Sequence, residues 1–377
     1  MKVMQVTLGL WAGAGGPSRS IAGLTRGLSL LPDMEVCLFD HFLGPSSGND
    51  LGRAKWIKGV WQGNVFDSVR QFQKALDEEK PDIVHFHGIW HPIIHFDCCA
   101  CRRLGIPYVI APRGSLDAWS LKQKWLKKKI ALWLYQMRDL RHAAALHVTA
   151  DMEADYCRAM GYRGKFIISP NGVNLPATLP AWNRRADGKR RMLFLSRMHP
   201  KKGIGELIEA LRVLREQDAP GAADWECELV YTVFQDEEKR YEQEMKSLVD
   251  RYRLSDRVVF TGKLSDADKW LAYRRADCFV LPSHTENFGI VIAEAMYAGL
   301  PVITTKNTPW QRIVSVQSGW WIDLRVDELV RALSEMMVLS DVERTEMGAR
   351  GRQLVESTCS WESACKMMVQ GYREVLA

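Results

Sequence analysis

The sequence has 377 residues, of which 47% are hydrophobic and 25% are charged, values typical of soluble globular proteins. The chain is longer than one ordinary hydrophobic core accommodates, which favours two domains. The formal net charge of +6 suits anionic ligands but is too small to call for nucleic acid. Nine irregularly spaced cysteines argue against a disulfide framework, and no apolar run approaches the roughly 20 residues of a membrane span. We therefore expect a cytoplasmic protein with reduced thiols and no nucleic-acid partner.

The first apolar run, Val3–Leu8, predicts a strand that leads through a glycine-rich turn into a helix. Such a turn allows the backbone to approach a phosphate or a sugar closely. A dinucleotide-binding site is the alternative, because Gly13-x-Gly15 is present and Asp40 ends the next apolar run, where a ribose-binding acid would lie. Ser18 stands at the position of that motif's third glycine, so the motif is incomplete and this alternative stays open.

Three histidines lie at or just beyond the end of the next predicted strand, Ile83–His87: they are His85, His87 and His91. Histidines at the carboxyl end of a strand can ligate a metal or transfer protons. His85 and His87 share one face of the strand, where a histidine is often a packed, hydrogen-bonded core residue. We favour pocket lining for His87 and His91 over metal binding, and we expect no metal site.

The segment from Ser120 to His142 predicts a basic amphipathic helix that follows the strand Tyr108–Ala111. Apolar residues recur along it at spacings of four and three and are expected to share one face: Leu126, Ile130, Trp133, Met137 and Leu140. Lysines and arginines supply much of the remaining surface. Two interpretations stay open: a solvated helix packed on its own domain, or a helix that contacts an anionic membrane surface, where each lysine contributes ~1 kcal/mol.

Strands and helices alternate along both halves of the chain, which predicts an α/β protein with two doubly wound, Rossmann-like domains that face a central cleft. The prolines and the polar run before residue 192 indicate a linker. We expect an N-terminal acceptor-side domain at 1–178, a linker at 179–191, a C-terminal nucleotide-sugar domain at 192–358, and a last helix at 359–377 that packs back on the N-terminal domain.

Two glutamates flank a strand–loop–helix junction in the second half. A short apolar run at 277–281 predicts a buried strand, and Ile290–Ala298 predicts a helix that Gly299 ends. Glu286 lies in the loop, and Glu294, separated from it by seven residues, lies inside the helix. The helix N-terminus between them favours an anion. A ligand with a polar ring, a diphosphate and a second polar ring fits this order, as in a nucleotide-sugar.

The stretch Pro282–Met296 resembles the E-x7-E signature of retaining glycosyltransferases of the GT-B fold, in particular family 4, whose members act in bacterial surface-polysaccharide synthesis. Arg197 and Lys202, which follow a predicted strand, resemble the diphosphate-binding pair of that family. The glycine loop Gly15–Ser18 and the turn Pro170–Asn174 are also similar to the family's N-terminal loop and inter-domain turn. The resemblance covers nearly the whole chain.

The resemblance implies a role for each matching residue. Glu286 would hold hydroxyls of the donor sugar, while Arg197 and Lys202 would neutralise the diphosphate leaving group. Glu294 would bind the ribose. The remaining donor contacts would come from backbone groups of Gly15, Gly16, Phe288, Gly289 and Ile290. Two fixed cations and a helix N-terminus can stabilise the developing charge without a metal, so we expect neither a metal nor another cofactor.

One position departs from the family pattern. Many relatives carry His-Gly after the strand that ends at Ala111, whereas this chain carries Arg113-Gly114. Arginine cannot act as a base at neutral pH. Acceptor deprotonation would then fall to the donor phosphate, to Asp117 or to His87, and Arg113 would instead steer an anionic acceptor.

The implied activity is metal-independent, retaining hexosyl transfer from a nucleotide-diphosphate sugar to a glycan, in particular a lipid-linked one, in surface polysaccharide or lipopolysaccharide synthesis. Such an enzyme would be cytoplasmic, with a peripheral position on the inner membrane where an anionic surface is a further partner. Three alternatives stay open: a nucleotide-sugar epimerase of the same fold, an NAD-dependent enzyme, and a non-catalytic scaffold that binds membranes or glycans.

Overall fold

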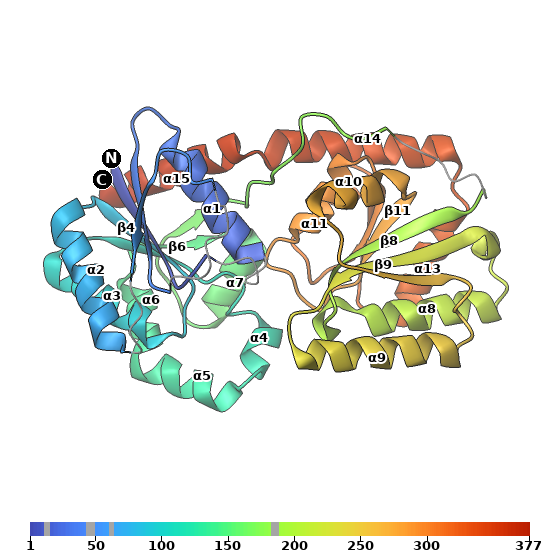
Figure 1. Ribbon diagram of the computed structural model, residues 1–377, viewed down its shortest axis with the longest axis horizontal. Helices are drawn as coiled ribbons and strands as arrows, with labels where there is room; N and C mark the ends of the chain where they lie inside the picture. Colours follow the sequence, from blue (N-terminus) through green and yellow to red (C-terminus); the bar gives the residue numbers. More distant parts are fainter. Residues whose placement is uncertain (11–15, 43–49, 60–63, 182–187) are drawn as a thin grey trace. The chain divides into compact units, whose positions relative to one another are not determined.

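The computed structural model describes residues 1–10, 16–42, 50–59, 64–181 and 188–377 (Figure 1). The contacts within the chain define two compact units. One unit combines Met1–Asn174 with Cys359–Ala377, and the other consists of Leu175–Thr358. Each unit is built around one parallel sheet, which confirms the predicted α/β class with two doubly wound domains. Within the described ranges, no helix is long and apolar enough to cross a membrane.

The N-terminal unit contains a seven-stranded sheet with the order β3-β2-β1-β4-β5-β6-β7. Neighbouring strands all pair in parallel. The strands are β1 (Lys2–Thr7), β2 (Glu35–Asp40), β3 (Lys55–Lys58), β4 (Ile83–His87), β5 (Tyr108–Ala111), β6 (Ala145–Val148) and β7 (Phe166–Ile168). The sequence pattern does not predict β3, because a lysine stands at each end of this four-residue edge strand.

Alternate residues of these strands point to opposite faces of the sheet, and helices cover both faces. Met4 of β1 packs with Phe72 and Cys98 on one face, whereas Val3 packs with Leu28 on the other. The helices that supply these contacts are α1 (Gly16–Ser29), α2 (Val65–Glu79), α3 (Pro92–Leu104) and the C-terminal α15 (Trp361–Leu376). Figure 1 shows α15 beside α1, in agreement with their contacts.

Helix α15 is held on the N-terminal unit by close packing. Gly23 and Gly172 lie against the Trp361 indole, and a Cβ added to them would come within 2.0 and 2.2 Å of its ring atoms. Tyr372 is fully buried, and its hydroxyl accepts a hydrogen bond of 3.2 Å from the Gln5 amide. The glycine of the turn at 170–174 is therefore required by the approach of the last helix.

The C-terminal unit contains a six-stranded parallel sheet with the order β10-β9-β8-β11-β12-β13. Its strands are β8 (Arg190–Arg197), β9 (Trp225–Thr232), β10 (Val258–Gly262), β11 (Cys278–Leu281), β12 (Val302–Thr305) and β13 (Gly319–Ile322). The main helices are α8 (Ile204–Glu216), α9 (Asp236–Arg251), α10 (Asp266–Arg275), α11 (Ile290–Tyr297), α13 (Val326–Met337) and α14 (Asp341–Thr358). Helix α8 packs against α13, and α11 packs against α14.

In both sheets the first strand lies inside the sheet, and the chain winds first to one side of it and then to the other. This reversal falls between β1 and β4 in the N-terminal unit and between β8 and β11 in the C-terminal unit. Ligands of open parallel sheets bind beyond the carboxyl ends of the strands at such a point. Arg197 ends β8, and the loop that carries Glu286 follows β11. The topology therefore brings the predicted donor residues to the expected ligand position.

The segment 118–142 differs from the single helix that the sequence predicts. It forms α4 (Ala118–Lys122), α5 (Trp125–Ala131), a π-helical turn η2 (Leu132–Gln136) and α6 (Met137–His142). A π-helical turn contains more residues than an α-helical turn, so it rotates the residues after it relative to those before it. Trp133, within this turn, is exposed, whereas Leu140, which follows it in α6, is fully buried. The prediction of one continuous apolar face was wrong.

Candidate functional site

Two loops of the C-terminal unit meet beyond the carboxyl ends of β8 and β11. Gly203 follows the short 3-10 turn Pro200–Lys202 and has a φ of 70°. A Cβ at this position would lie 1.9 Å from the carbonyl oxygen of Pro282, so only glycine allows this approach. The Lys201 carbonyl accepts hydrogen bonds from the His284 amide at 2.8 Å and the Ser283 hydroxyl at 3.0 Å. These contacts fix the two loops against each other.

The junction places Lys202 beside Glu286. The Lys202 ammonium forms an ion pair with Glu286 Oε1, and the two side chains are only 16% and 13% exposed. The same carboxylate oxygen accepts a hydrogen bond of 3.1 Å from the Ser283 hydroxyl. The structure therefore brings together two of the three residues that we predicted to be catalytic, although they are far apart in the sequence.

Helix α11 begins directly after this ion pair. Gly289 precedes the helix with a φ of 78°, which favours glycine. The Phe288 carbonyl accepts a hydrogen bond of 2.5 Å from the Trp310 indole, and the two rings lie 5.2 Å apart. Within the described chain, the amides of Phe288, Gly289 and Ile290 have no recorded acceptor. The N–H groups and the helix dipole at this point favour an anion beside Lys202.

Glu294 lies within α11 and is 4% exposed. Its Oε1 atom pairs with the Lys269 ammonium at 2.7 Å, and its Oε2 atom accepts a hydrogen bond of 2.9 Å from the Tyr273 hydroxyl. Both partners come from α10. Lys269 and Tyr273 cannot be identified from the sequence, because nothing in the local pattern of α10 shows which of its residues face α11. A ribose that contacts Glu294 would therefore meet a carboxylate whose orientation is already fixed.

Arg197 is more exposed than Lys202 and has a different partner. Its Nε donates a hydrogen bond of 3.0 Å to Glu238 at the start of α9, and a second guanidinium nitrogen pairs with the same oxygen. Glu238 also accepts a hydrogen bond from the Phe234 amide at 2.6 Å. Burial by itself raises the pKa of Glu238, but the hydrogen bonds from Phe234 and Arg197 outweigh it and the pKa is lowered. The contacts with Glu238 leave the third guanidinium nitrogen of Arg197 with donors for a diphosphate.

Asp266 and Asp268 form an acidic pair of the kind that can hold a metal with a diphosphate. They lie in the first turn of α10, where the Ser265 hydroxyl accepts from the Asp268 amide at 3.1 Å. Acidic residues are common in the first turn of a helix because they favour the positive end of its dipole. Helix capping thus accounts for this pair. Among the described residues, no three His, Cys, Asp or Glu side chains gather as a metal site would require.

In the N-terminal unit, Arg113 lies in the turn after β5 with a φ of 55°. One guanidinium nitrogen donates to Asn171 at 2.9 Å and to Ser20 at 3.3 Å, and the other donates to His87 Nδ1 at 2.9 Å. The Nε atom is buried without a hydrogen-bond partner among the described residues. Burial lowers the pKa of Arg113 to about 10, so it remains a cation at neutral pH.

His87 belongs to a buried hydrogen-bond network that reaches the last helix. Its Nδ1 accepts from Arg113, so its Nε2 donates to Gln5 at 2.6 Å. Tyr372 accepts from Gln5 and donates to His85 Nδ1 at 2.6 Å. Burial, reinforced by the charge of Arg113, holds the pKa of His87 well below its usual value. Both ring nitrogens of this neutral histidine are occupied, so the geometry suits the positioning of Arg113 better than proton abstraction.

Asp117, the third acceptor-side candidate, caps α4. Its two carboxylate oxygens accept from the Ser120 amide at 2.6 Å and the Ser120 hydroxyl at 2.9 Å. Glu153, which the sequence analysis missed, fixes the neighbouring turn by accepting from the Gly114 amide at 2.7 Å and the Thr149 amide at 2.8 Å. Of the predicted glycine loop, Gly16 begins α1, whereas Gly15 lies outside the described residues.

A cavity of about 470 Å³ in the C-terminal unit lies elsewhere. Asp277, Pro301 and Arg344 are among the residues that line it. Asp277 and Pro301 precede β11 and β12, so the cavity is at the amino ends of these strands. It therefore lies at the opposite end of the sheet from Glu286 and is not the candidate donor site.

The chain matches two protein families over most of its length. Residues 15–172 match the family "Glycosyl transferase 4-like domain", and residues 178–354 match "Glycosyl transferases group 1". Among curated relatives, the chain is 25% identical to an alpha-1,3/1,6-mannosyltransferase of Dictyostelium discoideum over 47% of this chain and 44% of that protein. It is 30% identical to a D-inositol 3-phosphate glycosyltransferase of Salinispora tropica, over 56% of this chain and 46% of that protein. The matched regions thus span less than half of each of these two relatives.

Solved structures have the same fold. A sucrose-phosphate synthase from Thermosynechococcus elongatus superposes with a TM-score of 0.76 at 20% identity, covering 100% of this chain and 99% of that one. HepE of Anabaena, solved in complex with UDP and glucose, superposes with a TM-score of 0.74 at 16% identity, covering 99% of both chains. At such identities the comparison shows the two-domain GT-B fold.

Proposed function

Because the chain belongs to the glycosyltransferases through its glycosyl transferase 4-like and group 1 domains, we propose that it transfers a hexose, with retention, from a nucleotide-diphosphate sugar to a glycan acceptor. The observation that carries the proposal is the Lys202–Glu286 ion pair beside the N-terminus of α11, at the point where the strand order reverses. An alpha-1,3/1,6-mannosyltransferase and a D-inositol 3-phosphate glycosyltransferase among the relatives, and a similar structure solved with UDP and glucose, support the donor and acceptor classes.

In the proposed reaction the bond between the sugar C1 and the diphosphate oxygen breaks, and the acceptor hydroxyl forms a new bond to C1 on the same face. The acceptor proton passes to the departing phosphate, and the products are the glycosylated acceptor and a nucleoside diphosphate. Lys202, the α11 amides and Arg197 stabilise the charge on the leaving group. Glu286 orients the sugar, and Glu294 binds the ribose. Lys202, Arg197 and the α11 amides supply the positive charge that a metal would otherwise provide, so the proposal includes metal independence.

On the acceptor side, we propose that Arg113 binds an anionic group such as the phosphate of a lipid-linked glycan. The hydrogen-bond partners of the guanidinium, His87, Asn171 and Ser20, are neutral. The nearby carboxyl of Glu153 favours the charged form of Arg113, but burial outweighs it and the pKa of Arg113 is lowered. Among the described residues its buried Nε donor has no acceptor, which costs about 1–3 kcal/mol. An anionic oxygen beside the guanidinium would remove this cost. An acceptor of this kind is suited to the synthesis of surface polysaccharide or lipopolysaccharide.

A panel of nucleotide-sugars tests the donor class. The cognate donor binds only the folded state and is expected to raise the melting temperature by about 2–4 °C per kcal/mol of binding at saturation. Nucleoside diphosphate should then be released slowly from that donor in the presence of a chelator. Conversion of the donor to an epimer without acceptor would contradict transfer, and stabilisation by a nicotinamide dinucleotide but by no nucleotide-sugar would contradict the donor class.

The acceptor proposal predicts a selective effect of substitutions at Arg113. Arg113→Gln removes the cation and is expected to raise KM for a phosphate-bearing acceptor by about tenfold or more, because a charged hydrogen bond contributes about 1.5–3 kcal/mol. KM for the donor should not change. Arg113→Lys should recover part of the loss, because it restores charge but not the planar fork. The control is Arg70→Gln, which replaces an exposed arginine on α2. An equal loss with an uncharged acceptor would contradict this assignment.

A further inference from the structure

The segment 118–142 presents an apolar surface that the proposed catalytic residues do not use. Helix α5 has no buried residue. Trp133 is 84% exposed, and four more large apolar side chains on α5 and η2 are between 50% and 60% exposed. We call these five residues the α5 patch: Trp125, Leu126, Ile130, Trp133 and Leu134. In Figure 1, α5 lies at the outer edge of the N-terminal unit, away from its sheet.

The α5 patch is surrounded by positive charge. Between residues 118 and 138 the chain has no acidic residue and six basic ones: Lys122, Lys124, Lys127, Lys128, Lys129 and Arg138. Lys128 donates to the Ser120 carbonyl and lies over the Trp90 ring. Within the described chain, no ion pair with an acid is recorded for the other four lysines. Exposed lysines elsewhere that pair with an acid are Lys55, Lys74, Lys239, Lys246, Lys306 and Lys366, so this segment is more positive than those surfaces.

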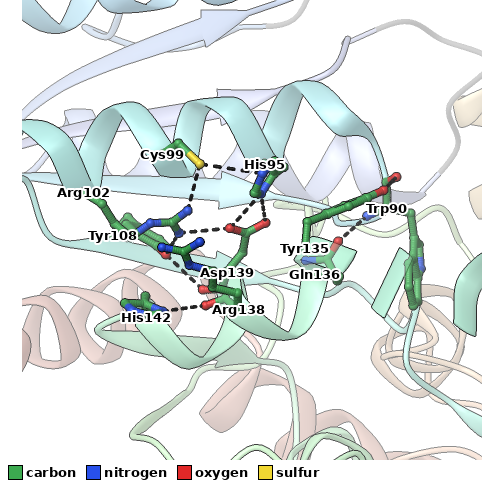
Figure 2. A network of polar contacts seen from close by, with 10 residues as sticks. All are labelled: Trp90, His95, Cys99, Arg102, Tyr108, Tyr135, Gln136, Arg138, Asp139 and His142. Carbon is green, nitrogen blue, oxygen red and sulfur yellow. Dashed lines mark hydrogen bonds and ion pairs between the residues drawn. The ribbon is translucent and has the colours of Figure 1, made fainter. Parts of the chain in front are cut away.

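The polar contacts in Figure 2 explain why the α5 patch does not fold back onto the domain. The Trp90 amide donates to Gln136 Oε1 at 2.9 Å, and Tyr135 donates to the Trp90 carbonyl at 2.8 Å. One turn later, Asp139 pairs with His95 at 2.8 Å and with Arg102 at 2.9 Å. These part-buried contacts orient η2 and α6 toward α3. The apolar residues of α5, together with Trp133 and Leu134 in the π-helical turn itself, are left exposed.

Three partners could cover this surface: a bilayer, another protein or a second copy of this chain. A second copy would bring two sets of unpaired lysines together, which is unfavourable. Tryptophans beside lysines suit the boundary between lipid headgroups and acyl chains, where the indole is partly wet and the ammonium remains hydrated. Anionic headgroups also complement the positive charge. The observations therefore favour a lipid surface.

We propose that α5 and η2 dock the protein on an anionic lipid bilayer, with the α5 patch inserted at the interface and the surrounding lysines on the headgroups. This docking is independent of the proposed glycosyl transfer. The patch would hold the N-terminal unit beside lipid-borne molecules, whatever reaction the C-terminal unit performs.

Co-sedimentation with vesicles tests the proposal. The full-length protein is expected to sediment with vesicles of phosphatidylcholine and phosphatidylglycerol but to remain in solution with phosphatidylcholine alone. Combined replacement of Lys122, Lys124, Lys127 and Lys129 by Gln should weaken binding at least about tenfold, because each lysine near an anionic surface strengthens binding by about fivefold. Trp133→Ser combined with Ile130→Ser should weaken binding even at high salt, where charge is screened.

The matched control removes the same number of charges from other surfaces. Lys74, Lys239, Lys246 and Lys366 are exposed and each pairs with an acid of its own helix, so their replacement by Gln should leave vesicle binding unchanged. The proposal is overturned if the wild type ignores anionic vesicles or if the control loses as much binding as the α5 variant. It is also overturned if, without vesicles, velocity sedimentation finds a dimer that Trp133→Ser dissociates, because a second copy then covers the patch.

Discussion

Replacing Lys202 by Met or Glu286 by Gln is expected to lower turnover by about 10²–10³-fold, the range observed when one group that stabilises transition-state charge is removed. Lys202 is held in place by its ion pair with Glu286, in the loop that leads into α11. The substitution of Lys202 removes charge from the leaving-group position. That of Glu286 removes the negative charge and replaces one of the two carboxylate oxygens that accept from sugar hydroxyls by an amide donor. Initial rates at saturating donor measure both effects.

A double substitution separates catalysis from stability. Each single substitution leaves one member of a poorly exposed ion pair without its partner, which is expected to cost about 1–3 kcal/mol of folding free energy. In Lys202→Met/Glu286→Gln neither charge remains, so the melting temperature should return toward the wild-type value while turnover stays low. Lys246→Met, which breaks an exposed ion pair on α9, is the control. Recovery of turnover together with stability would mean that the pair is structural only.

Replacement of Glu294 by Gln is expected to have the second largest effect, on donor affinity. A charged hydrogen bond to a ribose hydroxyl contributes about 1.5–3 kcal/mol, so KM for the donor should rise about tenfold to hundredfold. The change also leaves Lys269 unpaired with its side chain 12% exposed, and loss of one partner of a buried pair costs about 3–5 kcal/mol. Thermal unfolding should therefore shift downward as well.

The variant Glu294→Gln/Lys269→Gln distinguishes the two consequences. It removes both buried charges, so stability should recover relative to Glu294→Gln, whereas the weakened donor binding should persist. Tyr273 can still donate to the new amide oxygen, which keeps the helices α10 and α11 connected. If the double variant binds the donor as tightly as the wild type, Glu294 serves only to join these helices.

The order of elements in the C-terminal unit could be predicted because its signals are local. Apolar runs such as Cys278–Leu281 become buried strands, and Gly289 and Gly299 mark the two ends of α11. The position of Glu286 in a loop and of Glu294 in the first turns of a helix follows directly from these boundaries. Lys202 could be matched to Glu286 only through a resemblance, because their contact depends on the approach of Gly203 to Pro282.

The remaining features depend on contacts that spacing does not reveal. Lys269 is one polar residue among many on α10 until that helix packs on α11. Glu238 forms an ion pair with Arg197 only because α9 begins near the end of β8. The π-helical turn at Leu132–Gln136 has no marker in a pattern of apolar residues, so an ideal helical period places Trp133 and Leu140 on one face. Long-range packing and local helix geometry therefore decided what the sequence pattern left open.

Glycosyl transfer at the Lys202–Glu286 pair is tested by the release of nucleoside diphosphate from the cognate nucleotide-sugar in the presence of a chelator, with wild type and Lys202→Met/Glu286→Gln compared side by side. We expect steady release by the wild type, faster release when acceptor is added, and a loss of about 10²–10³-fold in the folded double variant. Equal release by both proteins, or release by the wild type only after a divalent ion is restored, would contradict this expectation.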